Sequence, residues 1–191
     1  MNFNERLTAL QQAHERLINR PNRKEETGNG IFSRYEYPVL TAEHTPLCWR
    51  YDLNPATNPS LMVRFGINAV FNAAAVKWNN KYVLVARVEG WDRKSFFAIA
   101  ESNDGVSGFT FRPFPLQIPE TAQPDTNVYD MRITAHEDGW IYGLFCTDRR
   151  APNAPAGDQT AAIVQCGIKP TDSVAVIGIG GLGHMALKFL R

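Results

Sequence analysis

Polar and charged side chains recur beside aromatic ones in this sequence, a pattern that is typical of sugar sites. Arg, Asp and Asn supply directional hydrogen bonds to hydroxyl groups, and Trp and Tyr rings offer flat apolar faces to a pyranose ring. The segments with this composition are 49–52, 64–68, Asn72, 87–89, 92–94, 125–127 and 129–132. Solvated strand faces with local ion pairs would have the same composition, so the pattern alone leaves both interpretations open.

A second motif, of a different chemistry, lies near the end of the chain. Gly178, Gly180 and Gly183 form GxGxxG between the apolar run 174–177 and a segment of helical character, 184–190. In a dinucleotide-binding unit these glycines allow a tight turn, a close approach to the pyrophosphate and close packing of helix on strand. The acidic residue that holds the ribose comes about 20 residues later. This sequence ends before that point, so we expect no useful NAD(P) affinity and interpret the three glycines as vestigial.

Composition and charge exclude several other classes of site and partner. A net charge of +1 without long basic runs argues against binding to nucleic acid or to a membrane. Three cysteines without CxxC spacing predict neither a disulfide framework nor a zinc site. His136 beside Glu137 is more typical of a solvated turn than of a metal site, so no metal is expected. With no signal-peptide pattern at the start, we expect a cytoplasmic protein.

The elements that must position these residues are predicted from periodicity. Apolar residues at spacings of three and four predict an amphipathic helix over residues 1–20, which Pro21 stops. After a polar connector, 24–30, helical periodicity disappears. Strands are predicted at 69–78, 82–88, 95–101, 109–111, 131–135 and 140–146, with turns at 79–80, 103–105 and 137–139. Short strands at this spacing indicate an all-β fold, either a sandwich or the four-stranded blades of a propeller.

Five segments of the strand-rich region resemble glycoside hydrolase family 130, in particular its mannosylglucose phosphorylases. They are 50–55 (RYDLNP), 64–73 (RFGINAVFNA), 84–95 (LVARVEGWDRKS), 124–132 (PDTNVYDMR) and 134–145 (TAHEDGWIYGLF). The resemblance implies a five-bladed β-propeller of which this chain holds the first blades. It also implies inverting phosphorolysis of a β-1,4-mannosyl-glucose disaccharide to α-mannose 1-phosphate and glucose. Inorganic phosphate is then a co-substrate, and no cofactor is implied.

The same resemblance implies roles for individual residues. Because phosphate is the nucleophile, one protein carboxyl group is enough, and Asp130 matches the family's general acid. Asn72 and Arg87 match mannose-contacting positions, and the surrounding motif positions that match with less defined roles are Arg64, Asn68, Asp92 and Arg132. Arg149 is the candidate for binding phosphate. For Arg132, a structural ion pair with Asp130 is the alternative interpretation.

The segment 167–190 resembles the start of the cofactor domain of zinc-dependent alcohol dehydrogenases. We therefore expect two parts: residues 1–166 from a propeller phosphorylase and residues 167–191 as an incomplete β-turn-α fragment, Rossmann-like, with the change of identity near 166–168. A propeller closes by pairing its first and last blades, so such a chain would keep open strand edges that a homo-oligomer could cover, and we expect little or no phosphorolysis from it. The alternatives are an NAD(P)-dependent alcohol dehydrogenase fragment and a non-catalytic carbohydrate-binding module.

Overall fold

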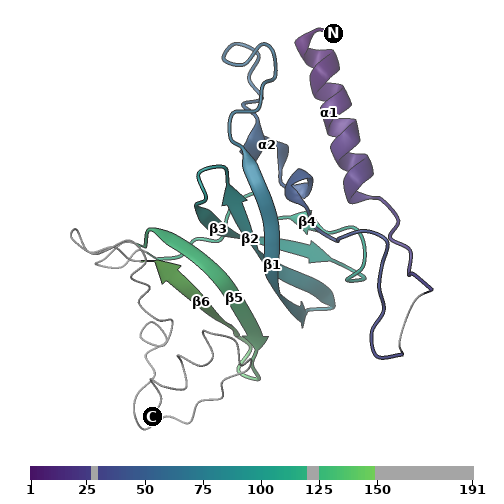
Figure 1. Cartoon of the computed structure of the whole chain (residues 1–191), viewed down its shortest axis with the longest axis vertical. Helices are drawn as coiled ribbons and strands as arrows, with labels where there is room; N and C mark the ends of the chain where they lie inside the picture. The colour runs from purple at the N-terminus through teal and green to yellow at the C-terminus, as the bar shows by residue number, and fades with distance from the viewer. Residues whose placement is uncertain (27–29, 120–124, 149–191) are drawn as a thin grey trace.

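The computed structural model describes residues 1–26, 30–119 and 125–148 (Figure 1). Their elements are α1 (Phe3–Ile18), η1 (Ala42–His44), α2 (Leu47–Arg50), β1 (Ile67–Trp78), β2 (Lys81–Gly90), β3 (Ser95–Ser102), β4 (Thr110–Phe111), β5 (Asn127–Ala135) and β6 (Ile141–Asp148). The described part is therefore mostly β, as predicted. Arg149 and the glycine-rich motif lie outside the described residues.

Strands β1 to β4 form an antiparallel sheet in which each strand pairs with the next along the chain. The predicted turn between β1 and β2 is confirmed, because Asn79 and Asn80 have φ values of 48° and 61°. Two successive residues with positive φ make the tight turn whose twist matches that of a hairpin. Strands β5 and β6 form a separate antiparallel hairpin, so the described residues contain two sheets and no closed ring.

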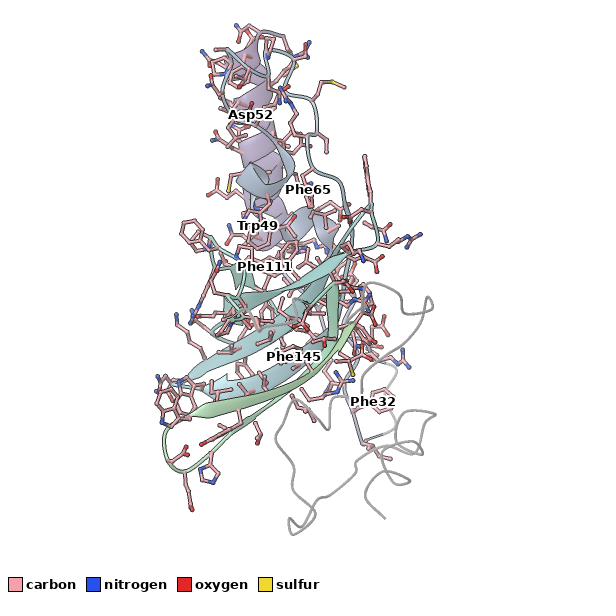
Figure 2. All side chains as sticks on the ribbon, turned by 90° about the vertical axis from the view of Figure 1, so that its left-hand side faces the viewer. Phe32, Trp49, Asp52, Phe65, Phe111 and Phe145 are labelled. Atoms are coloured by element: carbon pink, nitrogen blue, oxygen red, sulfur yellow. The ribbon has the colours of Figure 1, made fainter. Side chains whose placement is uncertain are left out.

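One face of the four-stranded sheet is covered by the segment that precedes it. Ala86, Val88, Ala98 and Ala100 alternate along β2 and β3 and pack with Leu40, Ile67, Phe109 and Phe111 in one buried cluster. The Trp49 ring closes this cluster from α2, 5.5 Å from the Phe96 ring and 5.8 Å from that of Phe111. Figure 2 shows Trp49 and Phe111 together on this side.

The opposite face of the same sheet is covered by the β5–β6 hairpin. Val85 and Phe97, one residue out of phase with the first cluster, pack against Ala74 and Met131. Phe145 of β6 meets Phe97 edge to face, with 5.5 Å between ring centroids. Because side chains alternate across a strand, β2 and β3 bury both of their faces, and the second cluster fixes where β5 crosses the sheet.

The predicted amino-terminal helix is confirmed as α1. Asn2 caps its start in a reciprocal capping box with Glu5, which satisfies two free backbone donors. Its apolar stripe is only half buried, and no residue of α1 is fully buried. Within the described residues, neither α1 nor α2 is long and apolar enough to cross a membrane.

Several expectations about the elements and their bounds were wrong. The segment after residue 30 is not free of helix, since it contains η1 and α2; helices of three and four residues are too short to show a period. Strand β5 begins at Asn127 rather than Met131, because the polar residues Asn127 and Asp130 interrupt the alternation over its first four residues. Trp140 belongs to the preceding turn, and β6 begins at Ile141.

Candidate functional site

Asn72 and Asp130 come from different sheets and meet in the structure. The Asn72 side-chain amide donates a hydrogen bond to Oδ1 of Asp130 across 58 positions of sequence. Both residues interrupt regular strands, since the β1–β2 register shifts between Phe71 and Ala74 and the β5–β6 register shifts between Tyr129 and Arg132. Both also have positive φ, 48° and 57°. Such bulges redirect side chains, and unfavourable backbone of this kind concentrates at functional sites.

Arg87 is held beside this pair by aromatic rings and a hydroxyl group. Its guanidinium carbon lies 4.7 Å from the centroid of the Phe71 ring and 5.4 Å from that of Tyr129, the neighbours of Asn72 and Asp130 in sequence. Its Nε donates to Oγ of Ser95 at 2.8 Å. Cation–π contacts on two rings restrict the rotation of the guanidinium group. Arg87 is therefore a preorganised, largely buried cation next to the Asn72–Asp130 contact.

The buried carboxylate of Glu89 accepts hydrogen bonds from three surrounding side chains. Its Oε1 accepts from Asn68 Nδ2 at 2.8 Å and from Arg93 Nη1 at 3.1 Å, and its Oε2 accepts from Arg87 Nη2 at 3.1 Å. Burial by itself raises the pKa of Glu89, but the hydrogen bonds from Asn68 and Arg93 and the two positive charges leave that pKa below its ordinary value. Glu89 is thus ionised at neutral pH and fixes three donors.

At this end one hydrogen bond joins the two sheets, and a second holds β5 to β6 within the hairpin. The Ser95 amide donates to Oδ1 of Asn127 at 2.8 Å, which joins β3 to β5. Tyr129 Oη donates to Asp148 Oδ1 at 3.0 Å. Burial, followed by the bond to Asp148, raises the pKa of Tyr129, so its hydroxyl keeps its proton. The relative position of Asp130 and Arg87 is therefore set by polar contacts as well as by the core.

Three other predicted site residues make their contacts with groups other than Asp130. Arg132 is exposed and donates to the Met131 carbonyl at 2.8 Å, and among the described residues no ion pair joins it to Asp130. Asp92 accepts from the Lys94 amide at 3.0 Å and so stabilises the β2–β3 turn. Arg64 lies 3.8 Å from Asp52 in the loop that precedes β1, and Figure 2 shows Asp52 far from Phe145 of the hairpin.

Several residues of this site were not singled out from the sequence. Glu89, Arg93, Ser95 and Tyr129 fall within or beside the polar segments but had no assigned role. The signal was present for Glu89, because it lies two residues from Arg87 on one strand and must share a face with it. Metal binding finds no support in the described residues, where no three His, Cys, Asp or Glu side chains converge.

The chain is similar to characterised proteins over most of its length. It is 56% identical over 169 residues to the 4-O-β-D-mannosyl-D-glucose phosphorylase of Bacteroides fragilis, a match that covers 88% of this chain and 43% of that enzyme. The chain thus spans less than half the length of this relative. No protein-family model matches it.

Two further similarities are weaker. Over 29 residues the chain is 66% identical to the aldehyde reductase AdhA of Synechocystis, 15% of this chain and 9% of that protein. A solved structure from Bacteroides ovatus, of a protein assigned as a glycoside hydrolase, has a TM-score of 0.43 at 23% identity and covers 66% of this chain and 33% of its own. Most of the chain is therefore similar in sequence to a mannosylglucose phosphorylase, and a short part to an aldehyde reductase.

Proposed function

We propose that this chain carries the general acid and part of the sugar-binding wall of an inverting glycoside phosphorylase. The substrate would be β-1,4-mannosyl-glucose, with inorganic phosphate as co-substrate and without a cofactor. The observation that carries the proposal is the contact between Asn72 and Asp130, two positive-φ residues placed together from separate sheets. The 56% identity to a mannosylglucose phosphorylase supports the same conclusion.

The chemistry follows from one carboxyl group and one phosphate. Asp130, in its protonated form, supplies a proton that reaches the leaving glucose oxygen through a sugar hydroxyl group, while a phosphate oxygen attacks the anomeric carbon from the opposite face. The bond from the anomeric carbon to the glucose oxygen breaks as the bond to phosphate forms, which inverts the configuration. Asn72 engages one carboxyl oxygen of Asp130 and leaves the other for the proton. Arg87, fixed between two rings, would donate to mannose hydroxyl groups.

Other parts of the proposal concern fold and secondary roles. Sheet β1–β4 and the β5–β6 hairpin, packed face to face, would be the first blades of a five-bladed propeller. Asn68 would orient the wall through Glu89, while Asp92, Arg132 and Arg64 would act at the rim. Arg149 would bind phosphate, since an Arg fork matches phosphate oxygens.

The test combines product analysis with ligand binding. The chain is incubated with mannosyl-glucose and phosphate, and mannose 1-phosphate is followed by phosphorus NMR, which also identifies its anomer. Because little or no release is expected from this chain, Asp130→Asn should abolish whatever release the unsubstituted chain shows, and it should leave sugar binding within about twofold. Glu137→Gln, which changes an exposed carboxylate in the β5–β6 turn, is the control and should leave release unchanged.

Three results would contradict or redirect the proposal. Release that survives in Asp130→Asn would remove the acid assignment. A β-configured product would exclude inversion. Binding of mannose 1-phosphate that substitutions of Asn72, Arg87 and Asp130 all leave unchanged would instead favour the non-catalytic carbohydrate-binding alternative.

A further inference from the structure

Two tyrosines of the β5–β6 hairpin donate a hydroxyl hydrogen bond to an aspartate, one at each end of the hairpin (Figure 1). At the open end, Tyr129 Oη donates to Oδ1 of Asp148 at 3.0 Å. At the turn, Tyr142 Oη donates to Oδ2 of Asp138 at 2.7 Å. The two pairs have the same chemistry, so their surroundings decide what each pair can do.

The surroundings of the two tyrosine rings differ. The Tyr129 ring is half buried, and the guanidinium carbon of Arg87 lies 5.4 Å from its centroid. Tyr142 is 53% exposed, and its ring meets the His136 ring edge to face with 5.7 Å between centroids. Of the two rings, the Tyr129 ring is therefore the one that contacts a cation of the candidate site.

Asp148 is itself held in place by the backbone of the hairpin. Its carbonyl oxygen accepts from the Thr126 amide at 2.7 Å and from the Thr126 hydroxyl group at 2.9 Å. Tyr129 pairs with Cys146, and Asp148 lies two residues further along β6, so its side chain shares the face of the Tyr129 ring. The Asp148 carboxylate therefore reaches the tyrosine hydroxyl group from a fixed backbone, and the hydrogen bond restricts where the ring can lie.

The Tyr129 ring is one of four contacts that orient the guanidinium group of Arg87. The Phe71 ring is a second, at 4.7 Å, while Ser95 accepts from Nε and Glu89 accepts from Nη2. Among the described residues these contacts use two of the five N–H groups, so three remain to donate to a ligand. A hydrogen bond to a carboxylate makes a phenol ring richer in electrons, which strengthens the attraction of that ring for a cation.

We propose that Asp148 is a positioning residue of the sugar site, which acts through the Tyr129 ring on the guanidinium group of Arg87. The inference rests on the proposed function, in which Arg87 donates to mannose hydroxyl groups. The Asp148 carboxylate holds the phenol, the phenol ring holds the plane of the guanidinium group, and that plane directs the remaining N–H groups toward the sugar. Loss of the carboxylate should thus weaken sugar binding through Arg87.

The experiment observes Arg87 first without a ligand and then with one. The Nε–H signal of Arg87, assigned by its loss in Arg87→Lys, is followed by nitrogen–proton NMR in the sugar-free chain, together with its hydrogen exchange rate. α-Mannose 1-phosphate is then titrated into the same samples, with dissociation constants from ligand-detected NMR. The variants are Asp148→Ala, Asp148→Asn and Tyr129→Phe, and the matched controls are Asp138→Ala and Tyr142→Phe at the other end of the hairpin.

We expect Asp148→Ala to shift the Nε–H signal of Arg87, to raise its exchange rate and to weaken mannose 1-phosphate binding roughly 3- to 10-fold. Asp148→Asn, which keeps an oxygen acceptor, and Tyr129→Phe, which keeps the ring, should each cause a smaller change, and the two controls should cause none. These two milder variants also keep the test independent of whether Asp148→Ala folds.

Two results would overturn this inference and spare the proposed function. One is an Arg87 signal that stays unchanged in all three variants, even where sugar binding falls. The other is a shifted Arg87 signal with unchanged affinity for mannose 1-phosphate. If the unsubstituted chain bound no mannose 1-phosphate, the proposed function and this inference would both fail.

Discussion

Replacing Glu89 by glutamine tests how much this buried carboxylate, with the donors that it binds, stabilises the folded chain. Glu89→Gln keeps the size of the side chain and removes its charge, so the guanidinium group of Arg87 faces a neutral amide. The Arg87 side chain is only 16% exposed, and water can replace little of the lost interaction. The Arg93 side chain is 74% exposed, so the loss of that ion pair contributes little.

The magnitude follows from these exposures. Removing one partner of a largely buried, hydrogen-bonded pair should cost about 2–3 kcal/mol. With a urea m value of about 2 kcal/mol/M for a domain of this size, the unfolding midpoint should fall by about 1–1.5 M. Urea unfolding followed by tryptophan fluorescence measures this midpoint. Because the folded pKa of Glu89 lies below the ordinary value of 4.5, its contribution is present above pH 4.5 and is lost as the pH falls through the folded pKa.

Glu101 supplies the control for this experiment. It also pairs with two cations, Lys81 at 2.9 Å and Arg112, but the side chains of both cations are more than half exposed. Glu101→Gln should therefore cost less than about 1 kcal/mol. Equal midpoint shifts in the two variants, or no shift in Glu89→Gln, would refute the reasoning from burial.

Two other predictions concern stability. His44 is buried, and its Nδ1 accepts a hydrogen bond from the Thr41 amide at 3.0 Å. Burial lowers the pKa of His44 most, and the positive charges of Arg20 and His14 lower it further. The folded state thus disfavours protonation of His44, so the free energy of unfolding should decrease as the pH falls below the ordinary pKa of 6.5. Urea titrations at pH 7 and pH 5 measure this decrease, and it should be smaller in His44→Asn. At the β1–β2 turn, Asn80 has a φ of 61°, which a residue with a Cβ atom adopts at a cost unless it is Asn or Asp. Asn80→Ala should therefore lower the free energy of unfolding by about 1 kcal/mol, and Asn80→Gly should not lower it. Equal thermal midpoints for the Ala and Gly variants would contradict this.

The strands and the first helix could be predicted from the sequence because their signals are local. Apolar residues at helical spacing predicted α1, and the Asn79-Asn80 pair between two apolar runs predicted the first hairpin. The beginning of β5 was missed for a physical reason. Asn127 and Asp130 are polar because they face the site or join the sheets, and this removes the alternation by which a strand is recognised.

The sequence by itself provided the candidate side chains for a sugar site, and its resemblance to a phosphorylase family singled out Asp130, Asn72 and Arg87 among them. It could not determine that Asn72 and Asp130 touch, or that Glu89 is the acceptor shared by Asn68, Arg87 and Arg93. Those contacts depend on two bulges and on the way the β5–β6 hairpin crosses the four-stranded sheet. The packing of Met131 against Val85 and Phe97 sets that crossing, and contacts between separate sheets leave no periodic trace in either strand.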